Sequence, residues 1–373
     1  MKSNRWLTLL LLFAVTLSGC VSNRLKGPVY AADGPPWVAG DRSVEIAPID
    51  LEYRILLIGD AGYYLEDDPT LAALGRWAED APLSSIVFLG DNIYNEGLVD
   101  DDRDRGEQIL SQQLESSVAQ KIFIPGNHDW GLSPKGQNRE AILNQQTFVD
   151  EWPDGSADFL PRDGCMGPMK RVLHDGGPGS RDVVLVALDP TPWINPRLRD
   201  ACPVPETHPS HLARLEDELA NHSDDFVLVA SHYPLRTGGP HGGLTYGVIG
   251  DMITGVIGWA WGGLMNTYEP NYADWIENVQ AVFRKHPPLA YAAGHDHNLQ
   301  LLDAEDFARI EIVSGAGARA RVSTVTNIPP TIFAHAAEGF VVLDFGRRDG
   351  GQVVVVRIVE VASPTPVFEM DVP

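Results

Sequence analysis

Short apolar segments alternate with amphipathic ones along most of the chain. Short, mostly apolar runs that end at glycine or polar residues predict buried strands. Segments with apolar side chains at helical spacing lie between them and predict helices that pack on a sheet. The alternation indicates an α/β domain. The expected strands span residues 53–58, 85–89, 121–124, 182–188, 226–230 and 289–293, and the expected helices span 69–80, 106–118, 139–150, 209–220 and 271–286.

The pattern changes after Gly294, where strand-like segments follow one another without helices between them. They span residues 299–302, 310–313, 340–345 and 352–359. We find no internal repeat and no low-complexity block. The pattern indicates a sheet-based α/β domain, and 373 residues are long enough for one large domain or two small ones.

The N-terminus has the pattern of an export signal. Lys2 and Arg5 precede a compact apolar run over residues 7–17, which ends in Leu-Ser-Gly-Cys at Cys20. Small residues before a cysteine resemble the lipobox of bacterial lipoproteins, in which the cysteine carries the lipid. We therefore expect a signal peptide over 1–19, a lipid anchor and tether over 20–45, and a membrane-anchored protein on the periplasmic or cell-surface side. An ordinary cleaved signal is the alternative.

The charge balance limits the partners of the protein. The 28 Lys and Arg are outnumbered by 51 Asp and Glu, which gives a net charge of −23. Such a surface repels nucleic acid, so we expect no nucleic-acid partner. A small anionic substrate would need a locally positive site, which bound metal ions could supply. The sequence indicates no protein partner.

Two cysteines remain after Cys20. Cys165 and Cys202 would suit one disulfide in an oxidising compartment, whereas a free pair is the alternative that sequence leaves open.

Polar clusters follow five of the expected strands. Their key residues are Asp60, Asp91, Asn127 with His128, His232, and His295 with His297. In an open α/β sheet, the loops at the carboxyl ends of strands converge on the ligand crevice. Alone, each cluster would be an ordinary turn or a packed histidine, but together they predict a site for two metal ions such as Fe, Mn or Zn.

These clusters resemble the calcineurin-like metallophosphoesterase family, and within it the purple, tartrate-resistant acid phosphatases. The ordered motifs are Gly-Asp, Gly-Asp-Asn, Gly-Asn-His, His and Gly-His-x-His. The family at large has a histidine ligand in the first loop, at the position of Gly62 in this chain. The purple branch lacks that histidine and instead has a tyrosine ligand in the second loop, here Tyr94, three residues after Asp91. The usual aromatic residue of the first loop is Ala61 here, which affects expected substrate contacts rather than metal binding.

The resemblance implies a fold and a ligand set. The fold would be two mixed β-sheets packed as a sandwich and flanked by helices, with the strand-rich end forming the second sheet. Residues 46–373 would then form one catalytic domain. A ferric ion would be held by Asp60, Tyr94 and His297. A divalent ion (Fe, Zn or Mn) would be held by Asn127, His232 and His295, and Asp91 would bridge the two. His128 and His241 would lie outside the ligand shell, orient the phosphate and protonate the leaving group.

The implied function is hydrolysis of small phosphomonoesters, as in acid phosphatases, by attack of a metal-bound hydroxide on phosphorus. One alternative is a phosphodiesterase or nucleotidase of the same superfamily. Another is a non-catalytic surface lipoprotein that binds metal.

One further segment, over about residues 238–270, is long for a loop between two site motifs. Its centre, residues 247–264, is apolar and has helical spacing. We expect either a buried helix or a lid beside the metal site that would influence substrate selectivity.

Overall fold

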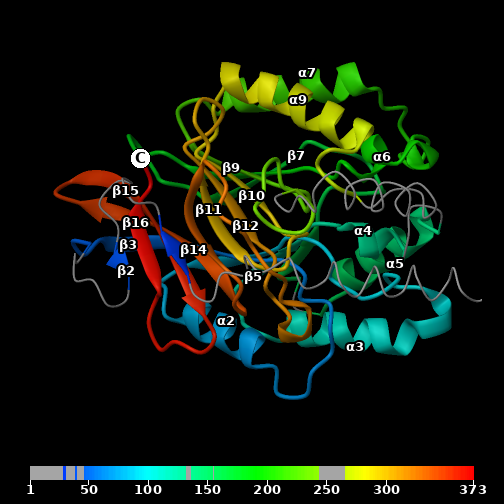
Figure 1. Ribbon diagram of the computed structural model, residues 1–373, viewed down its shortest axis with the longest axis horizontal. Coiled ribbons are helices and arrows are strands. Elements are labelled where there is room, and N and C mark those ends of the chain that lie inside the picture. Colours follow the sequence, from blue (N-terminus) through cyan, green and yellow to red (C-terminus); the bar gives the residue numbers. More distant parts are fainter. Residues whose placement is uncertain (1–27, 31–37, 40–45, 132–135, 154, 243–264) are drawn as a thin grey trace, which may run out of the picture.

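Two sheets packed face to face form the centre of the protein, and helices cover both outer faces (Figure 1). The computed structural model describes residues 28–30, 38–39, 46–131, 136–153, 155–242 and 265–373. The signal, the lipid-anchor cysteine and the apolar stretch over 247–264 lie outside these residues. No helix in the described ranges combines the length and the apolar character that crossing a membrane requires.

The first sheet contains the Asp60, Asp91 and Asn127 loops. In the described residues it has eight strands in the order β2-β16-β15-β14-β3-β4-β5-β6. The strands from β3 to β6 are parallel to one another, so their carboxyl ends lie at one edge. Its strands are β2 (Val38–Ala39), β3 (Asp50–Ile58), β4 (Ser84–Phe88), β5 (Gln120–Phe123), β6 (Ala157–Phe159), β14 (Gly339–Arg348), β15 (Gly351–Glu360) and β16 (Phe368–Asp371).

The second sheet contains the loops with His232, His295 and His297. Its order within the described residues is β1-β13-β11-β12-β10-β9-β8-β7, and β8, β9, β10 and β12 are parallel. Its strands are β1 (Val29–Tyr30), β7 (Met169–His174), β8 (Val183–Ala187), β9 (Phe226–Ala230), β10 (Ala290–Ala293), β11 (Leu299–Asp303), β12 (Ile310–Ser314) and β13 (Thr331–His335).

The sandwich is confirmed, but the assignment of the whole strand-rich end to the second sheet is wrong. The strands β11 to β13 do extend the second sheet, whereas β14 to β16 pair with β3 and complete the first. The chain therefore crosses between the sheets after β13. Strand pairing depends on contacts between distant segments, and β14 meets β3 almost 300 residues away in sequence, so a local pattern does not reveal it.

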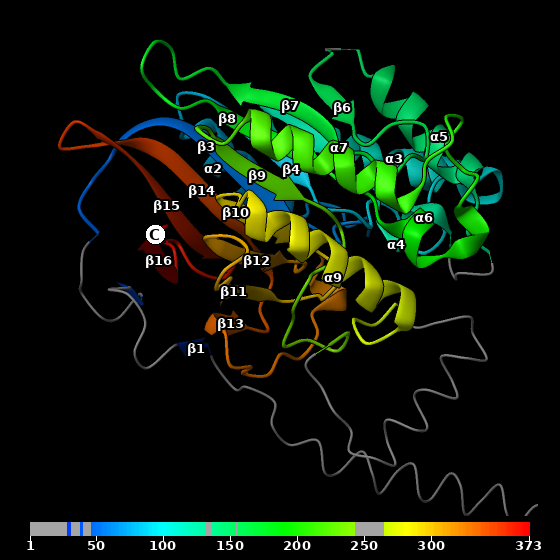
Figure 2. The same cartoon turned by 90° about the horizontal axis from the view of Figure 1, so that it is seen from above.

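Helices complete the four layers. Figure 1 shows α2 (Pro69–Glu79) and α3 (Arg103–Leu114) on one outer face and α7 (His208–Asn221) and α9 (Pro270–Lys285) on the other. The helix α5 (Arg139–Asp150) matches its predicted range, whereas α3 begins and ends earlier than expected. Viewed from above, α7 and α9 run across the second sheet (Figure 2). Apolar faces account for this, because the inner side chains of α9, Trp275, Val279 and Phe283, are buried against that sheet.

The two sheets meet closely at the edge where the parallel strands end. Apolar side chains of both sheets, such as Leu57 and Leu228, fill the space between them. At the edge, the Gly59 N–H donates to the Ser314 carbonyl across the sheets at 2.7 Å. This contact fixes the Asp60 loop of the first sheet beside the histidine loops of the second.

Candidate metal centre

Loops from both sheets bring the predicted ligands together. Asp60 follows β3 and Asp91 follows β4, while Asn127 begins the short helix α4 (Asn127–Trp130) after β5. His232 follows β9, and His295 and His297 follow β10. Asp60, Asp91, Asn127, His232 and His295 are therefore held by backbone that is anchored in buried parallel strands.

Three of these side chains sit on left-handed backbone. The φ angles are 60° at Asp60, 53° at Asp91 and 69° at His295, although none of the three is a glycine. Such conformations cost of order 1–3 kcal/mol each and are concentrated at functional sites. The strain turns each side chain sharply after its strand, toward the space between the loops.

One group of donor atoms comes from Asp60, Tyr94 and His297. The Tyr94 hydroxyl donates to Asp60 Oδ1 at 2.7 Å and lies 3.2 Å from His297 Nε2. His297 Nε2 lies 3.1 Å from the same Asp60 oxygen. Tyr94 and Asp60 are buried, and His297 is half-buried. This is the set that the resemblance assigns to the ferric ion.

A second group of donor atoms comes from Asn127, His232, His295 and Asp91. His232 Nε2 lies 3.1 Å from Asn127 Oδ1 and 3.1 Å from His295 Nδ1. The same nitrogen is 3.5 Å from Asp91 Oδ1. Asp60, Asp91 and His232 also present ligand atoms within 4.8 Å of one another, so Asp91 lies near both groups.

The backbone fixes which nitrogen each histidine presents. His232 Nδ1 faces the Leu89 carbonyl at 2.8 Å, and His297 Nδ1 faces the Arg321 carbonyl at 2.9 Å. His295 presents the opposite nitrogen, since its Nε2 faces the Met265 carbonyl at 2.9 Å. A carbonyl only accepts, so the nitrogen that faces it carries the proton. The other nitrogen keeps its lone pair and points into the donor group, an arrangement typical of metal-binding histidines.

The surroundings also set the charge of these groups. Burial, together with the neighbouring His241 and His232, lowers the pKa of His295 well below its usual value, so the ring is neutral at neutral pH. Burial raises the pKa of Tyr94 well above its usual value, and the charges of Asp60 and Asp91 add to this. Tyr94 is therefore a neutral phenol here, and only a strong Lewis acid would convert it to phenolate.

The geometry of the two groups fits metal ions. Metal–oxygen and metal–nitrogen bonds of about 2.0–2.2 Å place neighbouring ligand atoms about 3 Å apart. The separations of 2.7 to 3.2 Å within the first group and 3.1 to 3.5 Å in the second are close to this value. Carboxylate, phenol, amide and imidazole donors suit iron, zinc or manganese.

The two predicted outer histidines flank the donor groups. The His128 N–H donates to Asp91 Oδ1 at 2.8 Å, and His128 Nδ1 faces the Asn95 carbonyl at 2.7 Å. The His241 ring lies against His295 in a tilted arrangement with centroids 4.0 Å apart, and its Nδ1 lies 3.1 Å from Asn266 Oδ1. In both rings Nδ1 has a hydrogen-bond partner, and Nε2 has none among the described residues.

The structure leaves no room for a side chain at Gly62, the position at which the family at large has a histidine ligand. A Cβ atom at Gly62 would lie 2.6 Å from the Asp91 carbonyl oxygen and 2.7 Å from Ile93 N. Backbone atoms give way only if the whole loop moves, so this loop accepts no side chain there. The Tyr63 ring, two residues after Ala61, instead packs against Tyr94 with centroids 5.0 Å apart.

Sequence reasoning missed the role of Asp129. Its buried carboxylate accepts backbone N–H groups from Gly126 at 2.7 Å, Asn92 at 2.9 Å and Ile93 at 3.1 Å. It therefore ties the Asp91 loop to the Asn127 loop. The signal was present, because Asp129 follows Asn127-His128 directly, but its partners come from another loop. Arg321 was also missed, and its side chain lies over the Tyr94 ring.

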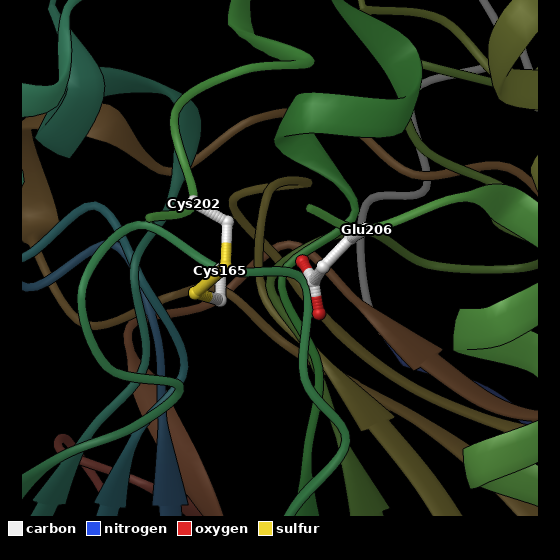
Figure 3. A group of neighbouring side chains, drawn as sticks. All are labelled: Cys165, Cys202 and Glu206. Carbon is white, nitrogen blue, oxygen red and sulfur yellow. A yellow bond between two sulfur atoms is a disulfide. The ribbon is translucent and has the colours of Figure 1, made fainter. Parts of the chain in front are cut away.

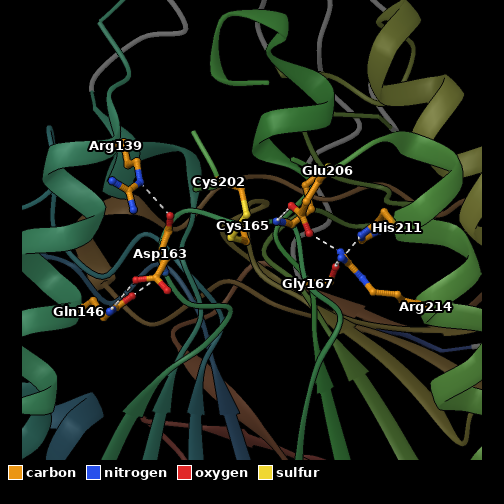
Figure 4. The surroundings of a disulfide bond; sticks show 10 residues. Arg139, Gln146, Asp163, Cys165, Gly167, Cys202, Glu206, His211 and Arg214 are labelled. Atoms are coloured by element: carbon orange, nitrogen blue, oxygen red, sulfur yellow. Dashed lines mark hydrogen bonds and ion pairs between the residues drawn. A yellow bond between two sulfur atoms is a disulfide. The ribbon is translucent and has the colours of Figure 1, made fainter. Parts of the chain in front are cut away.

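Cys165 and Cys202 are joined by a disulfide, which confirms the paired alternative (Figure 3). Glu206 lies beside them, but disulfide sulfurs are not thiolates, so this group is not a metal site. The carboxylate instead accepts the Met166 N–H at 2.8 Å and pairs with Arg214. Figure 4 shows Arg214 and His211 meeting at the Gly167 carbonyl, so the disulfide belongs to a structural network.

A two-sheet sandwich with a buried oxygen and nitrogen donor set at one edge has the architecture of a dinuclear metallohydrolase. A model of the calcineurin-like phosphoesterase family matches residues 53–299. The chain belongs to this family, whose members hold two metal ions.

Known proteins are similar to this chain at low identity. Purple acid phosphatase 17 of Arabidopsis thaliana is 24% identical over 334 residues, which cover 83% of this chain and 82% of that protein. Tartrate-resistant acid phosphatase type 5 of Oryctolagus cuniculus is 31% identical over 108 residues, or 29% of this chain and 24% of that protein. The solved structure of GAP50, the anchor in the inner membrane complex of Plasmodium, has a TM-score of 0.57 at 16% identity. The match covers 86% of this chain and 89% of that chain, and at this identity it shows a likeness of fold alone.

Proposed function

We propose that the protein hydrolyses phosphate monoesters at a centre of one ferric ion and one divalent ion. The observation that carries this proposal is the Tyr94 hydroxyl, which lies 2.7 Å from Asp60 Oδ1 and 3.2 Å from His297 Nε2. A buried phenol in such a group would suit a strongly acidic cation as a ligand. Two bound cations would supply an activated water and positive charge against the phosphoryl oxygens.

The residues of the chain would divide the remaining work. Asp60, Tyr94 and His297 would hold the ferric ion, and Asn127, His232 and His295 the divalent ion, with Asp91 shared. The Nε2 atoms of His128 and His241 would contact the phosphoryl group and pass a proton to the leaving alcohol, because their Nδ1 atoms are already engaged. The similarity to two acid phosphatases supports a monoester substrate.

Metal analysis, visible absorption and a substrate pair test this proposal together. Iron-loaded protein is expected to show a phenolate-to-iron band and to hydrolyse p-nitrophenyl phosphate faster than bis(p-nitrophenyl) phosphate. Tyr94→Phe is expected to lose the band, whereas Tyr63→Phe keeps it because the Tyr63 hydroxyl is not in the donor group. A colourless, fully active zinc or manganese enzyme would contradict the iron assignment, and preference for the diester would indicate a phosphodiesterase.

The outer histidines are tested separately. His128→Ala and His241→Ala are expected to lower turnover by about 10²- to 10⁴-fold and to keep both metals. His222→Ala, at the end of α7, is the control. Metal loss in His241→Ala would place this residue among the ligands instead.

We also propose that the protein is exported and held at a membrane by a lipid on Cys20. The N-terminal pattern supports this, and the Cys165–Cys202 disulfide is typical of oxidising compartments. Cys20→Ser is expected to release the protein from the membrane fraction. Unchanged membrane retention of this variant would contradict the lipid anchor.

A further inference from the structure

A cavity of about 350 Å³ opens beside the candidate metal centre. His241, His295 and His297 line it, so it is the approach to the donor groups. The segment that contains Arg321, which follows β12, also lines the cavity. Arg321 is the one lysine or arginine among the lining residues that the structure describes.

The Arg321 guanidinium is held in place by aromatic rings. It lies 4.3 Å from the centroid of Tyr94 and 5.8 Å from that of Tyr63. The arginine is half-buried, and its Nε–H is shielded without a hydrogen-bond acceptor among the described residues. Buried donors are normally paired, so an acceptor entering the cavity would complete this one.

The backbone around Arg321 is tied to a predicted ligand. The Arg321 carbonyl accepts the His297 Nδ1–H at 2.9 Å, and the Ser323 N–H donates to the His297 carbonyl at 2.8 Å. The guanidinium therefore keeps a fixed position relative to the donor group. A preorganised cation loses little freedom when it binds an anion.

Arg321 forms no ion pair with a carboxylate among the described residues, although the charge of Asp91 acts on it at longer range. The Asp296 carboxylate also lines the cavity, but it accepts the Thr237 hydroxyl and, at 3.1 Å, the His241 N–H. On a chain with a net charge of −23, a fixed guanidinium at the mouth of the site provides local attraction for an anion. Its planar fork matches the oxygens of a phosphate group.

We propose that Arg321 binds a phosphoryl oxygen of the substrate and favours substrates with a terminal, dianionic phosphate. The inference deepens the proposed function and names a binding residue beyond the metal ligands and outer histidines. A diester has fewer terminal oxygens and one negative charge, so it gains less from this contact.

Equilibrium binding of inorganic phosphate to metal-loaded protein tests the inference without turnover. Arg321→Gln is expected to weaken phosphate binding about 10- to 100-fold, as for loss of a charged hydrogen bond. Arg321→Lys is expected to recover part of the loss, because it keeps the charge without the planar fork. Arg319→Gln is the control, since Arg319 is exposed on the same turn and does not line the cavity.

Kinetics add a second measurement. For p-nitrophenyl phosphate, Arg321→Gln is expected to raise KM with little change in kcat, and the loss of kcat/KM is expected to be smaller for the diester. Unchanged phosphate affinity in Arg321→Gln would overturn the inference, as would metal loss that accounts for the weaker binding. If the protein binds phosphate through Arg321 but has no phosphoesterase activity, the inference about Arg321 is supported and only the proposed function is overturned.

Discussion

Asp129 allows a quantitative test of how the ligand loops are held together. Both of its oxygens are used: Oδ1 accepts the Asn92 and Ile93 N–H groups, and Oδ2 accepts the Gly126 N–H and the Asn92 amide. In Asp129→Asn one oxygen becomes an NH2 group, which meets backbone donors. At least one buried N–H then loses its acceptor.

The expected loss can be estimated from these bonds. A buried donor left without an acceptor costs about 1–3 kcal/mol. Part of this cost is offset, because the asparagine removes a charge from a site that disfavours it. Burial and the nearby charge of Asp91 raise the pKa of Asp129 well above its usual value, which makes the charged form of Asp129 unfavourable. We expect the free energy of unfolding to fall by about 2 kcal/mol. Because the Asp91 and Asn127 loops are no longer tied, metal affinity is expected to fall about 10- to 100-fold.

Asp68→Asn is a matched control for the same chemical change. Asp68 caps α2, and one oxygen, Oδ1, accepts both the Thr70 and Leu71 N–H groups. An asparagine keeps this oxygen and is itself a good N-cap, so little stability and no metal affinity should be lost. Urea unfolding of chelated protein and metal titration measure the two quantities. If Asp129→Asn matches wild type in both, the carboxylate does not organise the site.

Two further predictions concern Gly62 and His211. Gly62→Ala is expected to lower the free energy of unfolding by about 1–3 kcal/mol and to weaken metal binding, because its Cβ would meet the Asp91 loop at 2.6 Å. Gly351→Ala is the control, because the nearest contact of its Cβ would be at 3.7 Å. Equal free energies of unfolding for the two variants in urea would refute the clash. Burial lowers the pKa of His211 to about 4, so between pH 4 and 6.5 the unfolded chain binds a proton that the folded protein does not. The contribution of neutral His211 to the free energy of unfolding is complete above pH 6.5 and is lost as the pH falls toward 4. In chelated protein, the free energy of unfolding of wild type should therefore fall by about 3 kcal/mol relative to that of His211→Gln over this range. A constant difference between the two across this range would contradict the assignment.

Much of the site could be predicted because its signals are local. The Asp60, Asp91 and Asn127 loops each follow a buried strand, and an apolar run that ends at glycine and a polar residue is visible in sequence. The exchange of a histidine position, Gly62, for Tyr94 is also a local pattern, and the structure brings Tyr94 to Asp60 as the resemblance implied. The helix α5 was predicted over its whole range, because its capping Asn138 and its apolar spacing lie within one segment.

Other features depend on segments that are distant in the chain. Whether a late strand joins the first or the second sheet is a matter of pairing, and β14 to β16 pair with β3 rather than with β11 to β13. The proton positions on His232 and His297 depend on the Leu89 and Arg321 carbonyls, which come from other loops. Asp129 and Arg321 acquire their contacts in the same way. Periodicity and local order along the chain were therefore enough to predict the elements and the chemical types of the candidate ligands. The distant groups that orient and enclose these side chains could not be predicted in this way, because their contacts form only when the two sheets pack together.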